Sequence, residues 1–168
     1  MMFWKRDSDA QVPELSEQLL AIVGAQLPEA DPATVRTVTA ISGLLACVAF
    51  SDRTLHDAER THLREVLGSV HGIRAGGGEA ICELLERHLT QFTVVNPHAY
   101  TRTLRELTDR ETRLEVLEVL LEVGAADGEL SFDETQMLRR LTGALGLEQA
   151  DYNIAQAHHR ERLSSNKS

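Results

Sequence analysis

The sequence has only two cysteines, Cys47 and Cys82, among 168 residues. It contains no Cys-x-x-Cys pair and no Cys/His cluster with metal-finger spacing, so a zinc-finger fold is not expected. Both cysteines lie within apolar helical patterns, where a thiol behaves as a small hydrophobic side chain. The sequence therefore predicts reduced, buried thiols in a cytoplasmic protein.

Basic residues are also scarce, because Lys and Arg total 17 against 26 Asp and Glu, which gives a formal net charge of -9. A chain with this excess repels phosphate backbones unless it carries a local basic patch, and the sequence shows none. Nucleic-acid binding is therefore not expected. The acidic excess instead favours cations or basic protein partners.

Long apolar runs are missing. The longest stretch without a charged residue, Thr37–Ser51, is shorter than the ~20 residues that a membrane-spanning helix needs. We interpret it as a buried core helix and expect no transmembrane segment. Residues 1–12 carry no apolar signal-peptide core and are predicted to be a flexible arm. Phe3 and Trp4 beside Lys5 leave two interpretations open for this arm, peripheral contact with a membrane or packing against the core.

No segment combines sustained alternation with β-branched residues, so strands are not expected. Apolar residues instead recur at helical spacing, and the starts of helices are marked by Asp31-Pro32 and Asp109. The sequence predicts an all-α domain of seven to eight helices over residues 13–159, followed by a flexible tail over 160–168. The last helix is expected over Glu148–His159, with Ile154 and Ala157 facing inward.

A helix–acidic turn–helix unit occurs twice. Leu44–Val66 aligns with Val119–Leu141 at an offset of about 75 residues, which indicates an internal repeat. The two units are predicted to pair around an approximate two-fold axis. The apolar helices Thr34–Phe50 and Arg110–Ala126, which lead into the two turns, are predicted to form the core pair with Leu45 and Leu120 in one cluster.

The two turns collect acidic residues where helix carbonyls lie unpaired, and this oxygen-rich arrangement suits a hard divalent cation. The candidate ligands are Asp127, Glu129, Glu134, Asp52 and Glu59, with His56 nearby. A purely structural interpretation is also open. Asp-Gly is an ordinary turn pair, Ser131 with Glu134 forms a capping box, and Arg53 supplies its own positive charge beside Asp52.

An EF-hand is excluded because the twelfth position of each loop is a leucine, Leu63 or Leu138, where that loop needs an acidic residue. No motif pairs a nucleophile with a base, so the sequence predicts a non-enzymatic protein. The histidines are scattered along the chain, and solvated or core-edge positions are expected for them.

Three short motifs follow one another in the second half. Ala126–Glu129 reads Ala-Asp-Gly-Glu at the end of an apolar helix, Glu134 lies early in the next helix, and Leu145–Leu147 reads Leu-Gly-Leu. In these motifs the chain resembles the TerB-like family of tellurite-resistance-associated proteins. The resemblance covers roughly Ala40–Asp151.

The resemblance implies an all-helical fold with internal pseudo-symmetry and acidic residues that bind a metal ion. It also implies cytoplasmic work in protein complexes of a stress response, in some cases at the inner face of the membrane, with no established reaction. We therefore expect a non-enzymatic module that binds a divalent metal ion in a tellurite- or metal-resistance response. The alternative is a protein–protein interaction scaffold whose acidic turns are structural.

Overall fold

The computed structural model describes residues 17–51, 55–88 and 97–167, and within these ranges it contains helices and no strand. The predicted all-α class is confirmed. The helices are residues 17–26, α2 (Pro32–Ala49), α3 (Asp57–Gly68), α4 (Gly77–Arg87), α6 (His98–Leu107), α7 (Arg110–Gly124), α8 (Phe132–Ala144) and α9 (Gln149–Asn166). The predicted arm at residues 1–12 lies outside the described residues.

The predicted helix starts form because short polar side chains cap them. The Asp31 carboxylate accepts a hydrogen bond from the Thr34 backbone N–H at 2.7 Å, and Pro32 supplies the first helical residue of α2. The Asp109 carboxylate accepts from the Thr112 N–H at 2.8 Å and starts α7 in the same way. These caps satisfy backbone donors that the first turn leaves without an intrahelical partner.

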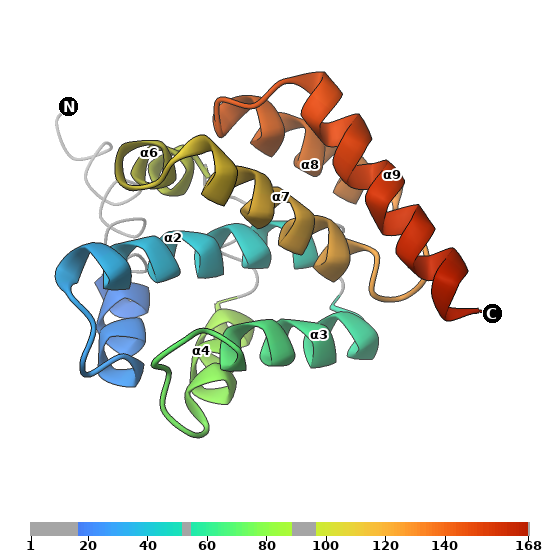
Figure 1. Cartoon of the computed structure of the whole chain (residues 1–168). Coiled ribbons are helices and arrows are strands. Elements are labelled where there is room, and N and C mark those ends of the chain that lie inside the picture. The colour runs from blue at the N-terminus through green and yellow to red at the C-terminus, as the bar shows by residue number, and fades with distance from the viewer. Residues whose placement is uncertain (1–16, 52–54, 89–96, 168) are drawn as a thin grey trace, which may run out of the picture.

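Helix α2 lies at the centre of the fold (Figure 1), with α3 and α4 on one side and α6, α7 and α8 on the other. By length and composition alone it could cross a membrane, with a mean hydropathy of 1.4, but 61% of that window is buried inside the fold. A helix enclosed by neighbours is apolar on most sides for that reason alone. The position of α2 therefore accounts for its apolar sequence.

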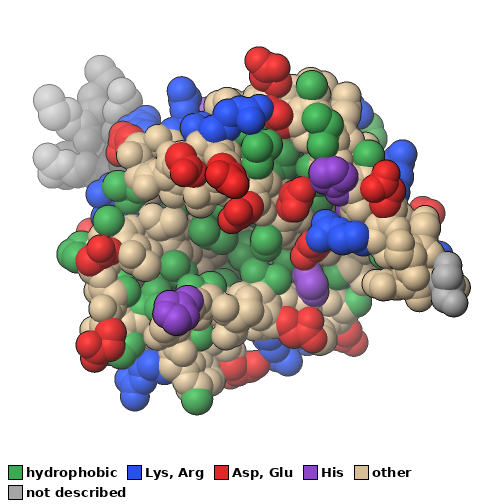
Figure 2. All heavy atoms as spheres, in the orientation of Figure 1, with side chains coloured by type: hydrophobic (Ala, Val, Ile, Leu, Met, Phe, Trp, Pro, Cys, Tyr) green, Lys and Arg blue, Asp and Glu red, His purple; other side chains and the backbone are tan. Residues whose placement is uncertain are grey.

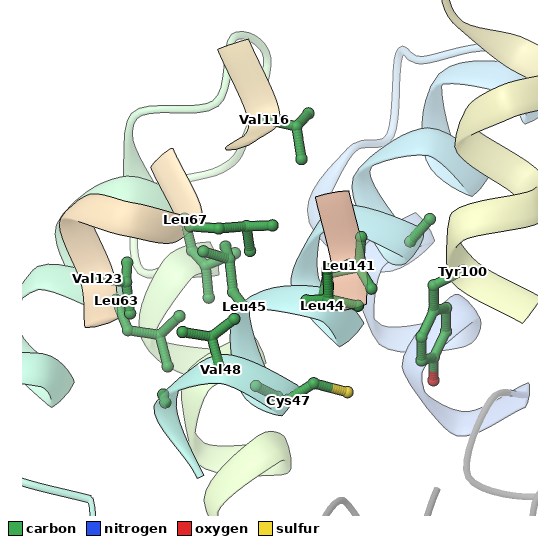
Figure 3. Packing of buried hydrophobic residues seen from close by; sticks show 14 of the residues in the cluster. Leu44, Leu45, Cys47, Val48, Leu63, Leu67, Tyr100, Val116, Val123 and Leu141 are labelled. Atoms are coloured by element: carbon green, nitrogen blue, oxygen red, sulfur yellow. The ribbon is translucent and has the colours of Figure 1, made fainter. Parts of the chain in front are cut away.

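The core joins α2 to α7, as the sequence predicts. Leu45 of α2 and Leu120 of α7 are both 0% exposed and belong to one contiguous hydrophobic cluster. Figure 3 shows Leu45 grouped with Leu63 of α3 and Val123 of α7, so three helices meet around it. The two helices that lead into the acidic turns are thus held by the same core.

Helix α2 also approaches α6 closely, and a glycine makes the approach possible. A Cβ atom added at Gly43 would lie 2.5 Å from the Tyr100 ring, closer than nonbonded carbon atoms can come. Tyr100 is itself buried. The α2–α6 contact therefore depends on the absence of a side chain at Gly43.

The last helix is longer than expected, since α9 continues past the predicted end at His159 to Asn166. Its final turns pair with acids on α7: Arg162 Nη1 lies 2.7 Å from Glu122 Oε1, and His158 Nδ1 lies 3.4 Å from Glu118 Oε1. Residues 160–166 of the predicted tail are therefore helical. The prediction of the boundary was wrong because these contacts join residues about forty positions apart.

The predicted inward face of α9 was also wrong. Ile154 is 55% exposed and Ala157 is exposed, whereas Tyr152 and Ala155 are buried. Tyr152 dominates the contact because its large ring fills the space beside α8, where the Arg139 guanidinium lies 5.8 Å from the ring centroid.

Candidate metal centre

The first turn of α3 holds a buried carboxylate. Glu59 is the third residue of the helix, and its Oε2 accepts a hydrogen bond from the His56 backbone N–H at 3.2 Å. The side chain bends back over the helix start to make this bond, which removes it from solvent, and Glu59 is 0% exposed.

The first turn of α8 repeats this arrangement. Glu134 Oε2 accepts from the Ser131 N–H at 2.7 Å, and the Glu134 N–H donates to Ser131 Oγ at 3.1 Å. The predicted capping box is confirmed, and it leaves Glu134 only 1% exposed. Two helices whose sequences align as a repeat therefore begin with the same buried acid, although the pseudo-two-fold relation itself stays a prediction.

The two capping glutamates lie beside each other. In each one Oε2 is used by the cap, while Oε1 is buried and has no hydrogen-bond partner among the described residues. Burial raises the pKa of Glu59 to about 9, the neighbouring Glu134 carboxyl and the charge of Asp127 contribute to the rise, and the His56 N–H opposes it. Two ionised carboxylates cannot satisfy each other, so this pair requires a proton or a cation.

The second acidic turn brings a third carboxylate to the pair. Gly128 takes a positive φ of 121°, which allows the chain to turn directly after Asp127. Asp127 Oδ2 lies 3.8 Å from His56 Nε2. His56, Glu59 and Asp127 each offer one ligand atom, and these three atoms all lie within 4.8 Å of one another.

The structure thus brings together some of the predicted site residues. Glu59, Asp127 and Glu134 converge, whereas Glu129 is exposed and lines a groove toward α9. Asp52 lies outside the described residues. His56 was noted in the sequence only as a neighbour, and the available signal was its place three residues before Glu59, which matches Ser131 before Glu134.

A divalent cation fits this set of donors. The two Oε1 atoms are buried without a hydrogen-bond partner among the described residues, and a bound cation could take the place of the proton that the raised pKa of Glu59 otherwise keeps on the pair. Carboxylate oxygens with one imidazole nitrogen suit Mn²⁺ or Zn²⁺, whereas Ca²⁺ and Mg²⁺ prefer oxygen ligands alone. The same geometry also fits two acids that share a proton.

Comparison with known families agrees with the all-helical fold. A search of curated proteins gives no match, and neither does a search of solved structures. Residues 38–157, well over half of the chain, match the family described as tellurite resistance protein TerB. The matched span contains His56, Glu59, Asp127 and Glu134. The chain therefore belongs to the TerB family.

Proposed function

We propose that this TerB-family chain is a non-enzymatic module that binds one divalent metal ion between its two acidic turns. Glu59, Asp127 and Glu134 supply carboxylate oxygens, and His56 supplies a ring nitrogen. Glu129 is an exposed acidic residue of the same turn and is not among the proposed ligands. The module acts in the cytoplasm, in a stress response of the tellurite- or metal-resistance type, through protein partners and with peripheral association with a membrane.

The observation that supports this proposal is the pair of buried Oε1 atoms without hydrogen-bond partners. Burying two carboxyl groups side by side keeps a proton on Glu59 in the metal-free protein, and a polar atom left unpaired in the interior costs about 1–3 kcal/mol. A cation between the carboxylates turns this cost into binding energy. It also links α3 to α8, so that the ion joins the two halves of the repeat. Because Glu59 holds a proton in the metal-free protein, binding releases that proton.

Calorimetry on chelator-stripped protein tests metal binding, with Ca²⁺, Mg²⁺, Mn²⁺ and Zn²⁺ as probes. A bound ion should raise the free energy of unfolding by about 2.7 kcal/mol at a hundredfold excess over its dissociation constant. Asp127→Asn should weaken binding because it removes a charged ligand, whereas Asp133→Asn, an exposed acid of the same turn region, should not. Absence of both heat and a melting shift at millimolar ion would rule out the metal function.

The scaffold alternative draws on a different observation, the two capping arrangements, which give Glu59 and Glu134 a structural role without any ion. It predicts that Asp127→Asn leaves partner binding intact, and that Glu134→Ala costs only about 1 kcal/mol of stability for the lost cap. A pull-down that compares these variants with the wild type distinguishes the two functions. If the Asp127→Asn protein is folded but no longer binds its protein partners, the scaffold alternative, in which the acidic turns are purely structural, is contradicted.

A further inference from the structure

A groove of about 510 Å³ lies between α6 and the end of α8. Figure 2 shows Lys and Arg side chains along the upper edge of the molecule, where α6 and the end of α8 lie. The residues that line the groove are His98, Thr101, Arg102, Arg105 and Glu106 of α6 and Ala144 of α8. The groove shares no residue with the metal centre described above.

Three of these side chains form a stripe along one face of α6. His98, Arg102 and Arg105 stand at positions i, i+4 and i+7, which lie on the same side of a helix. At a rise of about 1.5 Å per residue, the stripe is about 10 Å long. Arg102 and Arg105 are exposed, so their guanidinium groups are accessible to a partner. The groove is therefore an open, elongated surface and not an enclosed cavity.

A third guanidinium group lies near the α8 end of the groove. Arg113 of α7 donates from Nη1 to the Leu145 carbonyl oxygen at 2.6 Å, at a helix C-terminus, where a positive charge is favourable. A Cβ atom added at Gly146 would lie 2.9 Å from Arg113 Nη1 and 3.4 Å from Arg105 Nε. The guanidinium groups of Arg105 and Arg113 are therefore close neighbours, with no side chain of residue 146 between them.

The charges along α6 are not neutralised by the fold. Arginines elsewhere pair with carboxylates, for example Arg110 with Asp151 at 2.7 Å. Within residues 17–51, 55–88 and 97–167, by contrast, Arg102 and Arg105 take part in no ion pair, although the chain carries 26 Asp and Glu residues. Arg113 is held by backbone carbonyl oxygens, and its charge repels that of Arg105. A carboxylate placed beside Arg105 would relieve this repulsion.

We propose that this groove is the docking surface for an acidic segment of a protein partner, whose carboxylates pair with Arg102 and Arg105. A guanidinium group presents a planar fork of donors that binds a carboxylate through two parallel hydrogen bonds. An open surface about two helical turns long suits a peptide segment, because small ligands are held in concave pockets that bury most of their surface. The inference rests on the proposed function in one respect, the use of protein partners, and it does not depend on the metal ion.

Two other occupants fit the groove less well. Glu106 lies on the same wall and the chain has a net charge of -9, so a polyanion such as nucleic acid is repelled. A membrane surface needs apolar side chains beside the basic ones. The large exposed hydrophobic residues of the described ranges lie outside the groove, namely Leu20, Phe132, Ile154 and Leu163. A peptide avoids both conflicts, because a few carboxylates reach the arginines while the rest of the segment stays uncharged.

A fluorescein-labelled hexaglutamate peptide tests the docking surface by fluorescence anisotropy. The full chain is used at about 0.1 M salt, where exposed charges farther away than about 10 Å are screened. Hexaglutamate should bind, and an uncharged hexaglutamine peptide should not. Arg102→Ala and Arg105→Ala should each raise the dissociation constant by about threefold, the loss expected for one exposed ion pair. Arg105→Glu should raise it by about tenfold or more, because it replaces attraction by repulsion.

Arg87→Ala is the matched control, because it removes an exposed arginine of α4, on the other side of α2, with the same change in net charge. It should leave the affinity for hexaglutamate unchanged. The proposal is overturned if hexaglutamate does not bind, or if Arg87→Ala weakens binding as much as Arg105→Ala does.

The other occupants give different results. If Arg105→Glu abolishes self-association of the chain, or binding to phosphatidylserine vesicles, and leaves peptide binding unaffected, the groove takes a second copy or a membrane and the proposal is overturned. Metal calorimetry on Arg105→Glu should match the wild type, because the groove shares no residue with the metal centre. A failure of peptide docking and a failure of metal binding are therefore distinguished in the same set of proteins.

Discussion

Replacement of Glu59 by glutamine should stabilise the metal-free protein. At pH 7 the folded chain holds a proton on Glu59, whose pKa is raised to about 9, while the unfolded chain, with a pKa near 4.5, does not. Each pH unit above 4.5 therefore costs about 1.4 kcal/mol of folding free energy. At pH 7 the cost is about 3 kcal/mol. A glutamine removes it, because its amide oxygen can accept from the His56 N–H and its NH₂ can donate to Glu134.

The sign of the pH dependence follows from the same values. Between about pH 4.5 and 9 the folded state binds one more proton than the unfolded state, so the free energy of unfolding of the wild type should fall as pH rises. Below this window the contribution of Glu59 disappears. In Glu59→Gln the dependence should flatten. Glu134→Gln should flatten it less, because it removes the neighbouring carboxyl but leaves the burial of Glu59, which is the larger cause of the raised pKa.

Urea melts at pH 5, 6, 7 and 8 in the presence of a chelator measure both effects. Glu129→Gln is the control, because this exposed acid lies outside the pair and should leave stability and its pH dependence unchanged. The reasoning is refuted if Glu59→Gln is less stable than the wild type at pH 7 while the pH dependence persists. With saturating metal the order should reverse, since the ion stabilises the wild type and loses a charged ligand in the variant.

Two further predictions concern the core. Leu120→Ala and Leu45→Ala should each cost about 2–5 kcal/mol in denaturant melts, because both side chains are 0% exposed in one cluster; a loss below about 1 kcal/mol would contradict the core pair. Gly43→Ala should cost about 1–3 kcal/mol by thermal melting, since its Cβ would meet the Tyr100 ring at 2.5 Å, whereas Gly143→Ala in α8 has nothing within 4 Å and should be neutral or stabilising.

The fold could be predicted to a large extent because its signals are local. Asp31, Asp109 and Ser131 mark helix starts through bonds to residues only three positions away. The pairing of α2 with α7 in the core could also be predicted from the sequence, because helices that are apolar on most sides must be buried against each other. The buried face of α9 could not be predicted from the sequence, because Ile154 and Tyr152 are both plausible inward residues until the neighbouring helix is known.

The candidate site could be predicted only in part. Glu134 was recognised as a cap and Glu59 as its counterpart, but their sharing of one buried space is a contact between residues 75 positions apart. No periodicity encodes such a contact. His56 was missed as a ligand because histidine is an unusual residue at a helix start. Glu129 lies two residues after Asp127 in the same turn, yet it lines a groove beside α9 and is not in the group formed by His56, Glu59 and Asp127.

The end of α9 has a consequence for local opening. Its buried side chains are Tyr152 and Ala155, and the turns beyond them are held against α7 by charged contacts such as Arg162 to Glu122 and His158 to Glu118. Exposed ion pairs weaken as ionic strength rises, because salt screens charges over about 10 Å at 0.1 M. Amide hydrogens after Ala155 should therefore exchange faster in high salt, while the amides of α2 keep their protection, so that this segment opens by itself without global unfolding.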